Sequence, residues 1–144
     1  MVFIDASVIV AILAQEDDAD ALMARLEKHP GQFFVSAIVR MEASLSLTRR
    51  MAEAQGRDQP ASPEMLSQAR AMVDQFIVDL EAREAMISGD VGTKALDAAQ
   101  QFGKIVNHPA KLNMGDCFSY ACAKAYRTKI AYKGNDFTET DLGW

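Results

Sequence analysis

Residues 111–136, KLNMGDCFSYACAKAYRTKIAYKGND, decide the fold because they join one helix, one strand and two carboxylates in a single unit. Apolar residues recur at helical spacing in the first half, and a short strand is predicted at residues 129–132. Asp116 begins this unit and Asp136 ends it. Both acids also have a structural interpretation, because Asp116 can cap the helix that Asn113 starts and Asp136 can be a turn residue.

Length and composition predict one domain over residues 1–144. A chain of 144 residues that is 49% hydrophobic can bury a stable core without disulfide bonds or bound metals. The apolar N-terminal segment has no basic n-region, contains Asp5, and is far shorter than the ~20 residues of a membrane span. We therefore expect a soluble, cytoplasmic protein. Cys117 and Cys122 are interpreted as buried small hydrophobes.

The net charge of −5 argues against a protein that binds nucleic acid through bulk electrostatics. It is compatible with an enzyme that cleaves nucleic acid through metal ions. The acidic run Glu16, Asp17 and Asp18 precedes a predicted helix, where negative charge is stabilising. We interpret this run as a solvated helix cap.

Short apolar runs alternate with amphipathic segments along the chain. Strands are predicted at residues 2–4, 32–35, 85–87 and 129–132, and helices at 8–14 after a Ser7 cap, 19–28, 36–51, 63–80, 90–102 and after Asn113, with a polar loop at 55–61. This order predicts an α/β fold with a mostly parallel central sheet and helices on both faces. The apolar stripe from Leu66 to Leu80 is interpreted as core or as a surface for self-association.

Two acids upstream of the opening unit have more than one interpretation. Asp5 follows the first strand, at the sheet edge where ligands bind in open α/β folds, although it can also be a hydrogen-bonding turn residue. Glu42 is predicted on the same helical stripe as Ile38, Met41 and Leu45. Because a lone buried carboxylate is costly, Glu42 is either a metal ligand or the partner of Arg49.

In a parallel sheet, four acids are expected to converge at one edge: Asp5, Glu42, Asp116 and Asp136. Their carboxylates repel one another unless divalent cations lie between them. An all-oxygen site suits Mg²⁺ or Mn²⁺ better than Zn²⁺. Candidates for phosphate contacts are Lys133, Lys111 and Arg40, although exposed basic residues are more often only solvated.

Four segments occur in a specific order along nearly the whole chain: FIDAS at residues 3–7, SAIVRME at 36–42, NMGDC at 113–117 and KGNDF at 133–137. Together they resemble the PIN domain, and more closely the VapC-like toxins of bacterial toxin–antitoxin pairs. The resemblance implies a Mg²⁺- or Mn²⁺-dependent ribonuclease, usually a homodimer, inhibited by a small antitoxin whose tail enters the acidic groove.

The resemblance also implies roles for individual residues. The family's metal-site acids match Asp5, Glu42, Asp116 and Asp136, and its small hydroxyl residue matches Ser7. Asn135 is a departure, because close relatives often have a second acid there. The implied reaction is metal-assisted phosphodiester hydrolysis of RNA.

Two other classes of function remain open on the residues alone. A receiver-type phosphoacceptor domain also uses a strand-end aspartate with Mg²⁺, but its acid pair follows the first strand, whereas here one acid, Glu42, lies inside a helix. A binding module without catalytic activity could use the same acidic groove to hold a partner.

Overall fold

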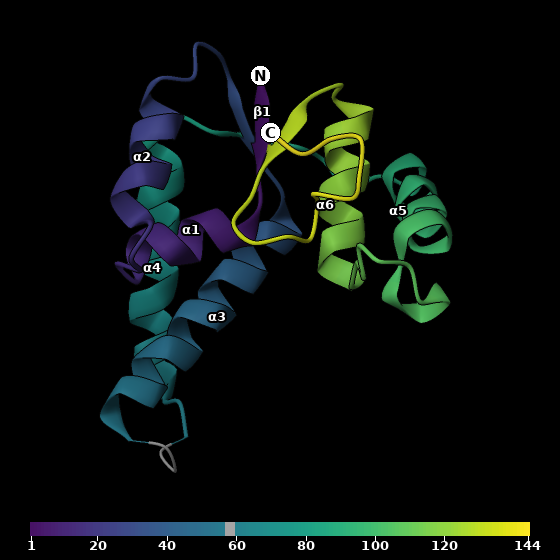
Figure 1. Ribbon diagram of the computed structural model, residues 1–144. Helices are drawn as coiled ribbons and strands as arrows, with labels where there is room; N and C mark the ends of the chain where they lie inside the picture. The colour runs from purple at the N-terminus through teal and green to yellow at the C-terminus, as the bar shows by residue number, and fades with distance from the viewer. Residues whose placement is uncertain (57–59) are drawn as a thin grey trace.

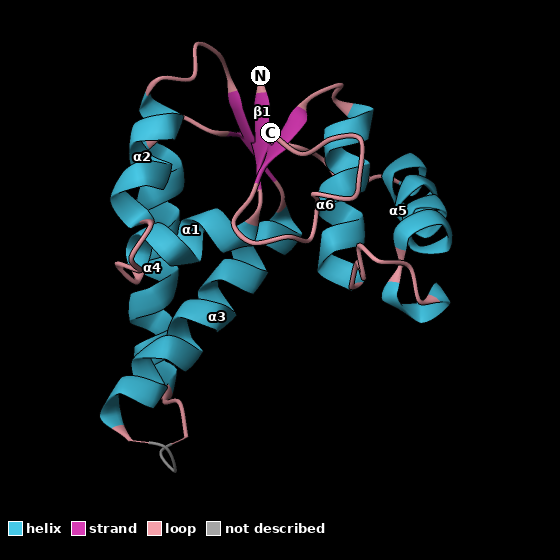
Figure 2. Cartoon of the chain, in the orientation of Figure 1, coloured by secondary structure: helices cyan, strands magenta, loops and turns pink. Residues whose placement is uncertain are grey.

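The computed structural model describes residues 1–56 and 60–144 as an α/β fold (Figure 1, Figure 2). The strands are β1 (Val2–Ile4), β2 (Phe33–Val35), β3 (Arg83–Glu84) and β4 (Lys129–Ala131). The helices are α1 (Ala6–Leu13), α2 (Ala19–Glu27), α3 (Ala37–Gln55), α4 (Pro63–Asp79), α5 (Gly89–Phe102) and α6 (Met114–Ala125), with a 3-10 turn, η1 (Lys104–Val106). The predicted polar loop at residues 55–61 lies partly outside the described residues.

All pairings in the sheet are parallel, and the strand order is β3-β2-β1-β4. In Figure 2 the sheet lies between α1 to α4 on one side and α5 and α6 on the other. The predicted parallel sheet with helices on both faces is therefore confirmed. Since β1 is central and pairs with both β2 and β4, its carboxyl end lies in the middle of the sheet edge.

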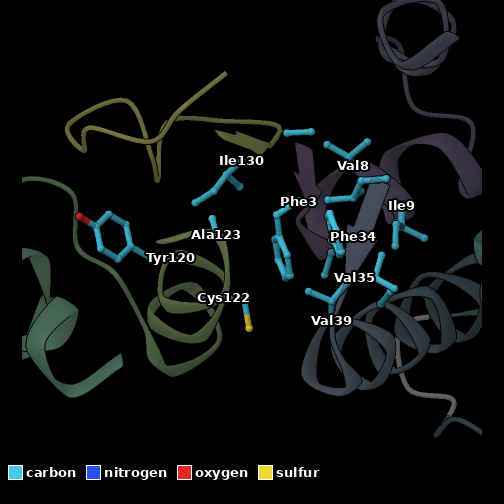
Figure 3. Packing of buried hydrophobic residues seen from close by; sticks show 14 of the residues in the cluster. Phe3, Val8, Ile9, Phe34, Val35, Val39, Tyr120, Cys122, Ala123 and Ile130 are labelled. Carbon is cyan, nitrogen blue, oxygen red and sulfur yellow. The ribbon is translucent and has the colours of Figure 1, made fainter. Parts of the chain in front are cut away.

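The core explains why β1 is apolar throughout. Val2, Phe3 and Ile4 are all buried, as expected for a strand covered on both faces. Figure 3 shows Phe3 among the buried side chains of this core. On the α6 side the contacts are made by small residues, Ala123 and Cys122, which let the helix pack closely. Both cysteines are free and buried, which confirms their interpretation as small hydrophobes.

The predicted apolar stripe of α4 is partly buried within the chain. Ala69, Val73 and Phe76 are covered, and α4 packs mainly against α3. The interpretation of this stripe as core is confirmed for Ala69, Val73 and Phe76, whereas self-association through the helices stays a prediction. In the described parts of the chain, no helix is both long and apolar enough to cross a membrane.

The third strand is displaced from its predicted position. β3 ends at Glu84, after which the Ala85 amide donates to Val35 O at 2.7 Å and Met86 is exposed. Pairing cannot continue, because Ser36 leaves the sheet to cap α3. The apolar run at 85–87 therefore follows the strand and does not form it.

The cap of α1 and the stripe of α3 also differ from the prediction. Asp5, and not Ser7, is the N-cap of α1, because its carboxylate accepts a hydrogen bond from the Ser7 amide. On α3, Met41 is 60% exposed and Leu45 is 40% exposed, so these residues do not mark the buried face. That face consists of Val39, Ala43, Ser44, Leu47, Thr48 and Ala52.

Candidate active site

A cavity of about 350 Å³ lies at the carboxyl edge of the sheet. Its lining includes all the predicted site acids and two of the other candidate residues: Asp5, Glu42, Asp116, Asp136, Ser7 and Lys133. We call it the acidic cavity. The convergence expected from the parallel sheet is present, since β1, α3, α6 and the segment after β4 each contribute one carboxylate.

Asp5 is held rigidly at the end of β1. One carboxylate oxygen accepts from the Ser7 amide at 3.0 Å and the other accepts from the Ser119 hydroxyl at 2.9 Å. Ser119 was not among the predicted site residues. The spacing in the sequence could have indicated Ser119 as a site residue, because a residue three positions after Asp116 lies on the same helical face.

Asp116 serves as a helix cap and as a cavity residue at once. Its Oδ2 accepts from the Asn113 amide at 3.1 Å, and its own amide donates to Asn113 Oδ1 at 2.9 Å, which forms a capping box. Burial raises the pKa of Asp116 to about 7; the Asn113 amide opposes this, and the charges of Asp5, Asp136 and Glu42 add to it. The capping box therefore uses one oxygen of the Asp116 carboxylate. The other acids of the cavity destabilise the charged form of this carboxylate.

Glu42 is half-buried, and its carboxylate lies against the first turn of α6. Burial raises the pKa of Glu42 to about 7, with a further contribution from the charge of Asp5. A β-carbon built on Gly115 would collide with the Glu42 carboxylate. Arg49 donates to Ser46, so the ion-pair interpretation of Glu42 is wrong. Gly115 therefore provides the space that Glu42 occupies.

Asp136 lies in an exposed part of the segment that follows β4. Desolvation raises its pKa, and the charge of Asp5 adds to the effect. The neighbouring Phe137 is buried and packs edge-on against Tyr132, with ring centroids 5.4 Å apart. This aromatic contact anchors the segment that carries the fourth acid.

The remaining candidates have different surroundings. Ser7 Oγ accepts from the Lys133 amide at 3.0 Å, which joins α1 to the segment after β4. The Lys133 ammonium binds Glu16 and Asp18. Arg40 pairs with Asp74 at 2.6 Å outside the acidic cavity, and Lys111 is exposed and does not line the cavity either.

The four acids fit a hard divalent cation by their chemistry. All their side-chain donors are oxygens, and each raised pKa has another cavity acid among its causes. In residues 1–56 and 60–144, no three Asp, Glu, His or Cys side chains already form a closed group of metal ligands.

Residues 2–142 match the family model of the PIN domain. The chain belongs to the PIN domain family. It is 46% identical over 144 residues to a VapC ribonuclease of Rhizobium meliloti (strain 1021), covering 99% of this chain and 100% of that protein. It is 32% identical over 139 residues to Ribonuclease VapC42 of Mycobacterium tuberculosis (strain ATCC 25618 / H37Rv), covering 96% of this chain and 95% of that one.

Solved structures share the fold of this PIN domain. VapC20 of Mycobacterium tuberculosis, described as a sarcin-ricin loop cleaving toxin, superposes with a TM-score of 0.71 at 16% identity, covering 99% of this chain and 96% of that one. A chain of a toxin–antitoxin complex from Klebsiella pneumoniae gives a TM-score of 0.64 at 16% identity, with 100% and 96% covered. The expected PIN-like fold is confirmed.

Removing the charge of Glu42 should stabilise the metal-free protein. The pKa of Glu42 rises on folding from its ordinary 4.5 to about 7, so the folded state binds more protons and stability falls as the pH rises through this interval. At pH 8 in EDTA we expect Glu42→Gln to raise the melting temperature by roughly 2–4 °C, equivalent to about 1 kcal/mol, and to weaken the pH dependence. Glu53→Gln, on the exposed surface of α3, is the control. A lower melting temperature for Glu42→Gln would contradict the repulsion.

Adding a methyl group at Gly115 should displace the Glu42 carboxylate. We expect Gly115→Ala to fold and to lower Mn²⁺ affinity about 10-fold, in the range seen when a ligand loses its support. Gly92→Ala on α5 is the matched control, because a β-carbon there meets nothing within 4 Å. Titration calorimetry with Mn²⁺ measures the difference, and equal affinities for the two variants would show that Gly115 does not position Glu42.

Proposed function

We propose that this PIN domain is a Mg²⁺- or Mn²⁺-dependent endoribonuclease that acts as the toxin of a toxin–antitoxin pair. The ribonuclease activity is supported by family membership and by full-length similarity to VapC ribonucleases. The observation that carries the metal dependence is the gathering of four carboxylates in one cavity, where burial and the charges of neighbouring acids raise the pKa of Glu42, Asp116 and Asp136. The full-length match leaves the phosphoacceptor alternative without a supporting observation.

In the proposed mechanism, Asp5 and Asp116 would hold the principal cation, and Glu42 and Asp136 would complete the site. A bound divalent cation supplies Lewis-acid polarisation of the scissile phosphate and lowers the pKa of an attacking water. Asp5 keeps its orientation through the Ser7 amide and the Ser119 hydroxyl, and Asp116 through the Asn113 amide. These contacts fix two carboxylates before the substrate arrives, so less reorganisation is needed in the transition state.

The proposed partners are an RNA substrate and a small cognate antitoxin. The Klebsiella pneumoniae neighbour is a toxin–antitoxin complex, which supports a protein partner of this kind. A basic side chain in the antitoxin tail would be electrostatically complementary to the acidic cavity. Such a tail would inhibit cleavage by occupying the space that the cation and the scissile phosphate need.

We further propose a homodimer, with an interface different from the one expected on α4. Apolar side chains are exposed beside a groove of about 470 Å³ between α5, η1 and α6. They are Leu96 at 73%, Ile105 at 88%, Val106 at 51% and Met114 at 75% exposure, and we call them the α5–η1 patch. Contiguous exposed apolar surface marks interaction sites, and twofold pairing is the commonest arrangement of oligomers.

A charge in the α5–η1 patch should separate the dimer. We expect the wild-type protein to be a dimer at micromolar concentration and Ile105→Glu to be a monomer with an unchanged melting temperature, as measured by light scattering and thermal melts. Met86→Glu is the control, because Met86 is 66% exposed but lies outside the patch. A monomeric wild type, or a dimeric Ile105→Glu, would refute this interface.

Asp116→Asn should separate the two roles of Asp116. Asparagine can still accept from the Asn113 amide, so the metal-free melting temperature in EDTA should be unchanged or higher. Cleavage of a mixed RNA pool in Mn²⁺ should fall by roughly two or more orders of magnitude, because a charged oxygen ligand is lost. Asp5→Asn should behave alike, and the double variant should lose little more, since both acids would hold one ion.

The matched control for Asp116→Asn is Asp90→Asn, which changes an acid in the first turn of α5 outside the acidic cavity. Its cleavage should equal that of the wild type. Metal-dependent cleavage retained by Asp116→Asn would make Asp116 a helix cap only and would remove the centre of the proposed site. Sequencing the 5′ ends of the RNA fragments would identify the cut site.

A further inference from the structure

Two cations line the acidic cavity together with the four acids, and one carboxylate, that of Glu16, binds them both. Arg50 extends from α3 and Lys133 from the segment after β4, whereas Glu16 follows α1. Arg50 Nη1 lies 2.5 Å from Glu16 Oε1, and Lys133 Nζ binds Glu16 Oε2. Lys133 Nζ also lies 3.0 Å from Asp18 Oδ1. The interpretation of Glu16 as part of a solvated cap is therefore wrong.

The Glu16 carboxylate divides its two oxygens between the two cations. Hydrogen bonds from Lys133 and then Arg50 lower the pKa of Glu16, and Glu16 raises the pKa of Lys133, so Glu16 and Lys133 stay charged. Two cations that bind the two oxygens of one carboxylate lie close together. They are therefore close enough to bind the two non-bridging oxygens of one phosphate. Their spacing therefore suits a phosphodiester group.

Both cations keep donors for a further partner. A guanidinium has five N–H donors and an ammonium has three, and only part of each set is directed at Glu16 and Asp18. The Arg50 side chain is 51% exposed and that of Lys133 is 35% exposed. A group that enters the acidic cavity can therefore reach both cations without breaking the contacts to Glu16.

Fold stability alone is a weak reason for this arrangement. Exposed ion pairs contribute little to the free energy of unfolding, because two long side chains lose conformational freedom in high dielectric. Substrate binding is a stronger reason, because a polyanion that approaches four carboxylates on a protein of net charge −5 is repelled unless cations lie beside them.

Resting on the proposed ribonuclease function, we infer that Arg50 and Lys133 together bind a backbone phosphate of the RNA beside the scissile bond, and that Glu16 is the positioning residue that holds them. Arg50 and Lys133 contact the substrate directly. Glu16 acts through them, by fixing their separation and their distance from the cavity acids.

The test measures RNA binding separately from cleavage. A fluorescent oligoribonucleotide is titrated in Mn²⁺ with each variant over a range of NaCl concentrations, and every protein carries Asp116→Asn, which is expected to slow cleavage by roughly two or more orders of magnitude. We expect Arg50→Gln and Lys133→Gln each to weaken binding about 10-fold and to reduce the slope of log Kobs against log[salt] by roughly 0.7–1, the value of one phosphate contact. Glu16→Asp keeps the charge but is too short to bridge both cations, so affinity should fall several-fold at an unchanged slope.

Lys94→Gln is the matched control, because the Lys94 side chain is 34% exposed, belongs to an ion pair with Asp90 and lies outside the acidic cavity. It should keep the slope and affinity of Asp116→Asn alone. Melting temperatures in EDTA report on folding: Arg50→Gln and Lys133→Gln with the slope of Asp116→Asn alone, with or without a lower melting temperature, would refute the inference and leave the trio a structural contact. Failure of the wild type to cleave RNA in Mn²⁺ would instead refute the proposed function, whatever the slopes.

Discussion

Repulsion between like charges at the carboxyl edge of the sheet is the constraint on which this structure depends. The fold places one acid at the end of β1 and another at the start of α6, and both are buried beside a third acid from α3. Each carboxylate needs a support that does not cancel its charge. The Ser119 hydroxyl supports Asp5, the Asn113 amide supports Asp116, and the space above Gly115 admits Glu42. The apolar core, with its buried central strand, must hold these groups together against their mutual repulsion.

The two interpretations of Asp116 are compatible in the structure. A capping box uses one carboxylate oxygen at the helix terminus and orients the group without neutralising it. The same hydrogen bond opposes the rise in the pKa of Asp116, so it helps to keep a buried acid available in its charged form. A local stabilising motif therefore also prepares a functional group. Asp5 follows the same rule, since it is both the N-cap of α1 and the acid at the centre of the sheet edge.

The order of the elements, the parallel sheet and the convergence of the four acids could be predicted from the sequence, because strand-end acids in a parallel sheet share one edge. Glu42 reached the cavity although its predicted stripe was wrong: Met41 and Leu45 are exposed, and Glu42 lies at the border of the buried face. The third strand was misplaced because its length depends on where β2 ends, which local apolarity does not encode. Contacts among Glu16, Arg50 and Lys133 join residues up to 117 positions apart, and sequence spacing carries no signal for such pairs.

The link between Ser7 and position 133 has a consequence for how such a molecule can diversify. Ser7 accepts from the backbone amide of Lys133, and every residue type except proline can supply that donor. The segment that carries Asp136 therefore keeps its place whichever side chain stands at position 133. Exchange of that side chain can alter what the rim of the cavity recognises while the scaffold under the acids is unchanged. Position 133 is thus a place where the side chain can change while the backbone contact that joins α1 to the segment after β4 is kept.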